Sequence, residues 1–145
     1  MIIGPDDRRL KKIDFKTSLP DLYRRPTDRF VSVDVPAMQF VKVDGRGDPN
    51  AAPTYRLAIE WLYAVSYAMK FAAKAAQGKG YVVPPLEGLW SADDPTDFVA
   101  RRKERWCWTM MIMAPAFIDR PLFEAAVEKA KKKLGTPPAS LRFER

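Results

Sequence analysis

Histidine is absent from this sequence of 145 residues, and Cys107 is its single cysteine. No intrachain disulfide can therefore form, and neither a Ser-His nor a Cys-His catalytic triad can be built. A zinc site would be limited to oxygen ligands and one thiolate. Acid–base chemistry falls to Glu, Asp, Tyr or Lys side chains, and we expect neither a metal nor a cofactor.

Long apolar runs are also absent. The N-terminus becomes charged within a few residues, so it lacks the apolar core of a signal peptide. No apolar stretch approaches the ~20 residues that a membrane-spanning helix needs. We therefore expect a cytoplasmic protein with no membrane partner.

The net charge of +7 and the pI of about 9.6 raise the possibility of a nucleic-acid partner. Lys and Arg, however, are spread over short clusters at 8–12, 24–25, 101–105 and 129–133. Helix-turn-helix, RNP and zinc-finger motifs are missing. We expect no specific nucleic-acid partner, and an apolar fraction of 47% predicts one globular domain with a real core.

The sequence pattern divides the first half of the chain into an N-terminal arm, two strands and a long helix. Residues 1–28 mix charges, prolines and a few apolar anchors such as Tyr23, which indicates an N-terminal arm that lies on the domain. Period-two alternation predicts strands over 30–36 and 39–44. An Ala-rich segment over 53–77, capped by Thr54 or Asn50 and ended by glycines, predicts a long helix.

The second half predicts the rest of an α+β domain spanning 29–145, with an antiparallel sheet and helices on one face. Residues 81–90 form an edge or bulged strand, because Pro84 and Pro85 cannot donate to a ladder. One turn of helix is expected around 97–102, a buried strand over 106–113 and a helix over 121–134. Residues 141–144 alternate like the opening of another strand.

One carboxylate, Glu87, stands close in sequence to Trp90 and is followed by a strand that contains Trp108 and Met111. Such a group recognises a soft cation through charge and ring faces, or acts as an acid or base if its site is dry. A strand rich in Trp and Met is, however, more often ordinary core than a ligand site. Tyr63 and Tyr67 share one helix face, where both hydroxyls would reach one ligand or simply meet water.

Four ordered blocks of the sequence resemble the stand-alone GyrI-like small-molecule-binding family. They are the run from Val35-Pro36 through Phe40 to Asn50, then Leu62 to Lys70, Pro85 to Trp90, and Trp108 to Ile112 with Pro115. The resemblance implies a β-α-β-β unit that occurs twice around a pseudo-twofold axis, with a ligand groove between the halves. Relatives include effector-binding domains of multidrug-sensing regulators and hydrolases of cyclopropane-containing alkylators. The same resemblance implies that six residues line this ligand groove: Tyr63, Tyr67, Glu87, Trp90, Trp108 and Met111.

The second β-α-β-β unit of that family is missing from this sequence. Either the chain is a half-length form that pairs with itself or with a complementary half, or it is an incomplete copy of a longer protein. In both cases the strand at 141–144 would expose an unpaired edge, so we expect association.

Three functions follow as hypotheses. The first is binding of apolar, aromatic or cationic small molecules in an aromatic and Met-lined groove that holds Glu87. The second is cofactor-independent hydrolysis of a strained electrophile, in which Glu87 activates water and Tyr67 donates a hydrogen bond to the developing oxyanion. The third is a protein–protein half-domain whose groove is filled by a partner's strand or helix.

Overall fold

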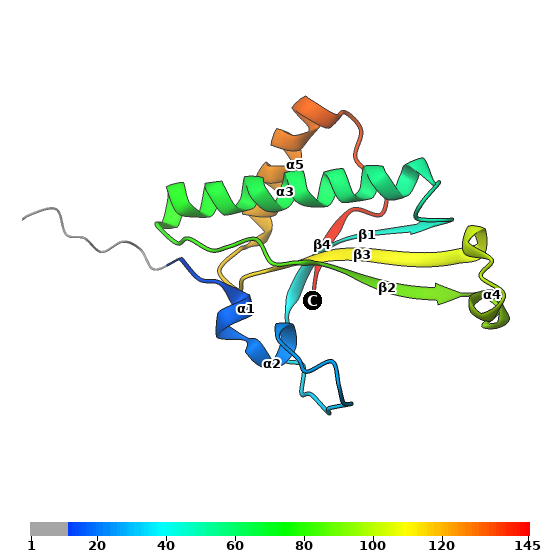
Figure 1. The fold of residues 1–145 in the computed structure, drawn as a ribbon. Coiled ribbons are helices and arrows are strands. Elements are labelled where there is room, and N and C mark those ends of the chain that lie inside the picture. The colour runs from blue at the N-terminus through cyan, green and yellow to red at the C-terminus, as the bar shows by residue number, and fades with distance from the viewer. Residues whose placement is uncertain (1–11) are drawn as a thin grey trace, which may run out of the picture.

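A four-stranded antiparallel sheet in the order β2-β3-β1-β4 forms the centre of the fold (Figure 1). The computed structural model describes residues 12–145, so the first eleven residues of the predicted arm lie outside the described part. The strands are β1 (Gln39–Arg46), β2 (Leu86–Ala92), β3 (Trp106–Ala114) and β4 (Arg142–Glu144). Helices α3 (Pro53–Gln77) and α5 (Arg120–Leu134) pack side by side on one face. The predicted α+β class is confirmed.

Short helices complete the structure. In the arm, α1 (Phe15–Ser18) and α2 (Pro20–Tyr23) lie on the side of the sheet away from α3 (Figure 1). Ile13 holds the arm to the domain through a parallel bridge to Tyr81. The connection between β2 and β3 contains α4 (Thr96–Val99) and a 3-10 turn (Lys103–Arg105).

The two long helices lie close to their predicted boundaries. Helix α3 spans 53–77 as predicted and ends at Gly78, whose φ of 65° is the left-handed conformation that favours glycine. Its N-cap, however, is Ala52 with no side-chain hydrogen bond, so the predicted cap at Thr54 or Asn50 is wrong. Helix α5 begins after Asp119, whose side chain accepts a hydrogen bond from the Leu122 amide at 2.9 Å.

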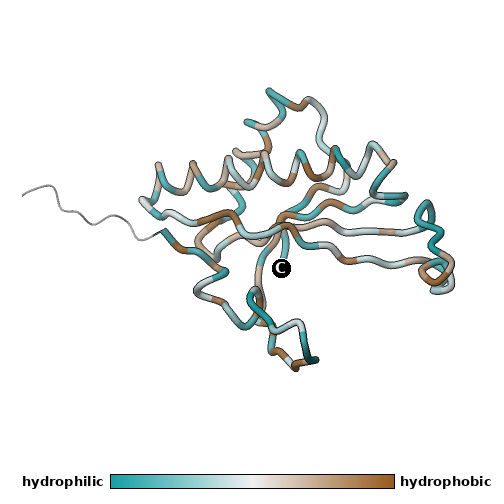
Figure 2. Tube along the Cα trace, viewed as in Figure 1, coloured by the Kyte–Doolittle hydropathy of each residue, from teal (hydrophilic) through white to brown (hydrophobic). Residues whose placement is uncertain are grey.

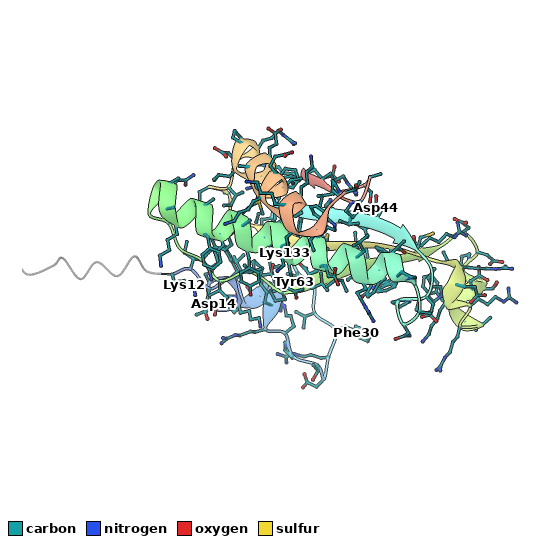
Figure 3. All side chains as sticks on the ribbon, turned by 90° about the horizontal axis from the view of Figure 1, so that it is seen from above. Lys12, Asp14, Phe30, Asp44, Tyr63 and Lys133 are labelled. Atoms are coloured by element: carbon teal, nitrogen blue, oxygen red, sulfur yellow. The ribbon has the colours of Figure 1, made fainter. Side chains whose placement is uncertain are left out.

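Two predicted strands differ from the structure. Residues 30–36 are coil with no strand partner, and Phe30 is fully exposed (Figure 3). Alternation alone predicted that strand, and it was wrong because a strand also needs a neighbour to pair with. The strand predicted over 81–90 begins only at Leu86, after the two prolines, and continues to Ala92.

The core lies between α3 and the sheet. The helix contributes buried Trp61, Leu62, Val65 and Met69, and the sheet contributes inward-facing residues from its two central strands. These inward-facing residues are Val41, Val43, Met110 and Ile112. Burying each large side chain stabilises the fold by about 1.5–3 kcal/mol. Apolar and polar segments alternate along α3 (Figure 2), with the apolar contacts made toward the sheet.

Gly45 permits a close contact in the core. Its neighbour across β1 and β3 is Trp108, whose indole lies directly over the glycine. A Cβ at position 45 would lie 2.1 Å from the ring carbon Cη2 of Trp108. Any side chain there would displace an indole that is 2% exposed and packed edge-on against Tyr55 at 5.2 Å.

We therefore predict that Gly45→Ala lowers the free energy of unfolding by about 1–3 kcal/mol, the usual cost of overpacking. Urea unfolding followed by tryptophan fluorescence measures the change. Gly80→Ala is the matched control, because a Cβ there meets its nearest atom at an ordinary 3.9 Å. Equal midpoints for the two variants would contradict the assigned contact.

Candidate functional site

Strand register sorts the predicted site residues between the two faces of the sheet. Trp90 pairs with Trp108 on the face that α3 covers, and Glu87 pairs with Met111 on the opposite face. Successive residues of a strand point to opposite faces, so Glu87 and Trp90, three positions apart, cannot share one face. We call the side away from α3 the open sheet face.

The six predicted residues consequently occupy three places. Trp108 is buried in the core, and Trp90 is 40% exposed at its rim beside Tyr55. Glu87 and Met111 are half-buried on the open sheet face. Tyr63 and Tyr67 project from α3 away from the sheet, into a groove shared with α5. The structure brings the residues together in pairs and does not assemble them into one groove.

A residue of the arm completes the surroundings of Glu87. Tyr23 ends α2, on the same side of the sheet, and its hydroxyl is buried. Burial, followed by the negative charge of Glu87, raises the pKa of Tyr23 to about 12. The phenol therefore stays protonated at neutral pH and is available as a hydrogen-bond donor.

Burial also raises the pKa of the Glu87 carboxyl above its usual range. Within residues 12–145, neither Glu87 Oε2 nor the Tyr23 hydroxyl has a hydrogen-bond partner, although both atoms are buried. Buried polar atoms without partners destabilise a fold and are uncommon unless they serve a function. Among residues 12–145, Glu87 is the one carboxylate with such an atom, and its charge acts on the Tyr23 phenol, so we take these two residues as the candidate catalytic or binding pair.

Lys42 and Arg142, two cations on the open sheet face, do not neutralise the negative charge of Glu87. The register gives one row across the sheet, Arg142, Lys42, Met111 and Glu87, so Lys42 lies two strands away, about 10 Å. Lys42 pairs with Glu144 at 3.2 Å, and Arg142 donates to Glu144 at 2.8 Å. Both cations are thus already neutralised by another carboxylate.

Asp44, a second carboxylate on the open sheet face, differs from Glu87 because it has hydrogen-bond and cationic partners. It accepts hydrogen bonds from Thr109 at 2.6 Å and from Arg142 at 2.8 Å. Burial alone would raise the pKa of Asp44, but these bonds outweigh it and lower the pKa below its usual value. Asp44 is therefore held as an anion, whereas the pKa of Glu87 stays raised.

Tyr23 is a candidate site residue that was not predicted from the sequence. The sequence identified it only as an apolar anchor of the arm, because it belongs to no strand or helix pattern shared with Glu87. Lys129 and Lys133 line the groove with Tyr63 and Tyr67, but the sequence identified them only as part of one of several short basic clusters. Both omissions concern contacts between segments far apart in the chain.

Within the described part of the chain, no three His, Cys, Asp or Glu side chains gather closely enough to hold a metal ion. The same residues include no helix with the length and apolarity needed to cross a bilayer. Cys107 is a free thiol that pairs in register with Arg46 and Ser91 on the open sheet face.

Neither a family model nor a curated protein matches this chain. Solved structures do: an uncharacterized conserved protein from Listeria innocua is 33% identical, with a TM-score of 0.81 over 92% of this chain and 66% of its own. Two further structures, each described as a hydrolase from Listeria innocua, are also 33% identical. Their TM-scores are 0.75 and 0.76, over 91% and 92% of this chain and 64% and 65% of theirs. The chain thus spans slightly less than two thirds of these neighbours, and its fold is shared with proteins described as hydrolases.

The raised pKa of Glu87 gives a testable link between pH and stability. The folded state holds the Glu87 proton more tightly than the unfolded state, so this group's contribution to stability falls as pH rises from the usual Glu pKa through the raised one. Glu87→Gln removes that titration. We predict that the melting temperature of Glu87→Gln minus that of the wild type increases between pH 4 and pH 8.

Differential scanning fluorimetry across that range measures the difference. Glu124→Gln, which removes the same charge from an exposed position of α5, is the control. A difference between Glu87→Gln and the wild type that stays constant with pH would show that the carboxyl is not perturbed by burial.

Proposed function

We propose that this chain is a hydrolytic small-molecule domain whose substrate lies on the open sheet face, over Glu87 and Tyr23. The observation that carries the proposal is the buried carboxyl–phenol pair, in which neither Glu87 Oε2 nor the Tyr23 hydroxyl has a partner among residues 12–145. The fold shared with hydrolases from Listeria innocua supports this reaction class. The GyrI-like resemblance suggests the substrate class, strained apolar electrophiles such as cyclopropane-containing alkylators.

The surface around the pair suits an apolar substrate. Met111 stands beside Glu87 in the register, and Leu89, which is 58% exposed, follows two residues along β2 on the same face. Thioether and leucine side chains contact apolar molecules without competing for the carboxylate. The substrate is thus held by dispersion and burial, and the polar chemistry is confined to Glu87 and Tyr23.

Each member of the pair has a distinct role in the reaction. Above its raised pKa, Glu87 is a carboxylate that accepts a proton from water while the water oxygen bonds to the strained carbon. The broken carbon–carbon bond leaves its electron pair on the conjugated carbonyl of the substrate, whose oxygen becomes negative. Tyr23, protonated because its pKa is about 12, donates a hydrogen bond to that oxygen.

This assignment replaces Tyr67 as the oxyanion donor. Tyr67 projects from the outer side of α3, so the whole sheet and helix layer separates it from Glu87. Tyr23 provides the same phenol chemistry from the arm. No metal or cofactor is needed for any step.

Binding of a soft cation without turnover is the second candidate, because an ionised Glu87 beside a tyrosine ring would attract one. The geometry favours it less. Trp90 and Trp108, which would have supplied the further ring faces, lie on the helix-covered side of the sheet. Among residues 12–145, Tyr23 is the aromatic residue that we assign next to the carboxylate.

We predict that a spirocyclopropyl-cyclohexadienone is ring-opened by water in the presence of this protein. Glu87→Gln should lower kcat/KM by about 100-fold or more, because a positioned base contributes that much. Tyr23→Phe should lower kcat by about 100-fold by removing the oxyanion donor. Mass spectrometry of the water adduct measures both effects, with Glu124→Gln as the control.

The pH dependence separates catalysis from binding. The rate of ring opening should rise with pH through an apparent pKa above the usual Glu range. In Glu87→Gln this rise of the rate with pH should disappear. An inert analogue carries a spirocyclohexane ring in place of the cyclopropane. If the protein binds this analogue but never opens the cyclopropane of the substrate, it is a small-molecule binder and the hydrolytic proposal fails. Turnover that persists in Glu87→Gln would remove the carboxylate from the mechanism.

A further inference from the structure

A row of three aromatic rings runs along the outer side of α3, on the far side of the helix from the sheet. Tyr63, Tyr67 and Phe71 are spaced by four residues and are 36%, 44% and 56% exposed. Their ring centroids are 6.4 Å apart in each step, and their planes lie within 29° of parallel. We call these three residues the ring row.

The ring row forms one wall of a groove of about 720 Å³ between α3 and α5. Small side chains make the floor: Ala64, Ala68 and Ala130. This volume falls in the range of small-molecule sites, which is about 300–1,000 Å³. Exposed large aromatic side chains gathered along a groove commonly mark a binding site.

Lysines supply the charge of the groove. Lys129 and Lys133 line it from α5, and Lys133 lies beside Tyr63 when the helix layer is viewed from above (Figure 3). Within residues 12–145, neither lysine forms an ion pair. On α3, the Lys70 ammonium lies 5.7 Å from the Tyr67 ring centroid and 5.5 Å from that of Phe71.

From this arrangement we propose that the α3–α5 groove is a second binding site, for planar aromatic anions. The ligand ring lies against the ring row, and its sulfonate, carboxylate or phosphate group meets Lys129 and Lys133. Glu60 is the one carboxylate that lines the groove, so the lysines leave the groove positive. A cationic ligand is therefore disfavoured here, in contrast to the open sheet face.

A second copy of the chain fits the groove poorly. Two copies that met through this face would bring Lys129 and Lys133 of each molecule toward those of the other, and like charges repel. The site is also independent of the proposed hydrolytic pair, since Glu87 and Tyr23 lie on the other side of the sheet. Its ligand therefore does not need to be a substrate.

Isothermal titration calorimetry with naphthalene-2-sulfonate and naphthalen-2-ylmethylammonium tests the proposal, because the two probes share a ring and differ in charge. The sulfonate should bind about tenfold tighter or more to the wild type. Tyr67→Ala should weaken the sulfonate about tenfold by removing the middle ring. The double variant Lys129→Gln/Lys133→Gln should weaken it similarly and abolish the preference for the anion.

Lys132→Gln is the control for charge on α5, because it removes one positive charge at an exposed residue outside the groove, where the double variant removes two inside it. It should leave sulfonate affinity unchanged, as should Glu87→Gln. Equal weakening by Lys132→Gln, or tighter sulfonate binding in Glu87→Gln, would place the anion elsewhere and overturn the proposal. Circular dichroism confirms that each variant is folded.

If a macromolecule and not a small molecule occupies the α3–α5 groove, light scattering or a peptide-binding measurement gives a different result. If light scattering shows a dimer that Tyr67→Ala converts to a monomer, the groove belongs to a second copy and the proposal fails. If a peptide of alternating glutamate and phenylalanine binds through the same residues tenfold tighter than the sulfonate, the occupant is a protein segment. Preference for the sulfonate by a monomeric protein supports the small-molecule site.

Discussion

The contact between Trp108 and Gly45 fixes the register of the two central strands, and the remaining geometry depends on that register. Because a side chain at position 45 would collide with the indole, β1 and β3 pair with Gly45 opposite Trp108. A slip of one residue would turn every side chain of β3 to the other face. This single pairing therefore decides that Met111 lies on the open sheet face while Met110 and Ile112 lie under α3.

The sequence predicted well what depends on local periodicity. Helix 53–77 and strand 106–114 carry long, regular patterns, and Gly78 marks the end of the helix. Residues 30–36 show that alternation without a pairing partner does not make a strand. The distribution of Glu87 and Trp90 between faces was available from their odd spacing in one strand, whereas the position of Tyr23 depends on the path of the arm and could not be predicted.

The open sheet face keeps two carboxylates in opposite states by distributing its cations unevenly. Arg142 binds both Asp44 and Glu144, and Lys42 binds Glu144, which leaves Glu87 with burial as the dominant influence. A fold optimised only for stability would have placed a cation or a neutral side chain at that position. This uneven distribution is what the proposed role of Glu87 requires, because a carboxyl group with a raised pKa is suited to acid–base chemistry.

The extended segment that follows α2 has a consequence for how this surface changes over evolution. Glu87 is fixed by the sheet, but Tyr23 is delivered by an arm that reaches β1 through coil residues 24–38, which pair with no strand. Insertions or substitutions in that coil would reposition the phenol without disturbing the register of any strand. In the proposed site the carboxylate is thus held by the sheet and the phenol by a separate segment, so the distance between the two groups can change without any change in the core.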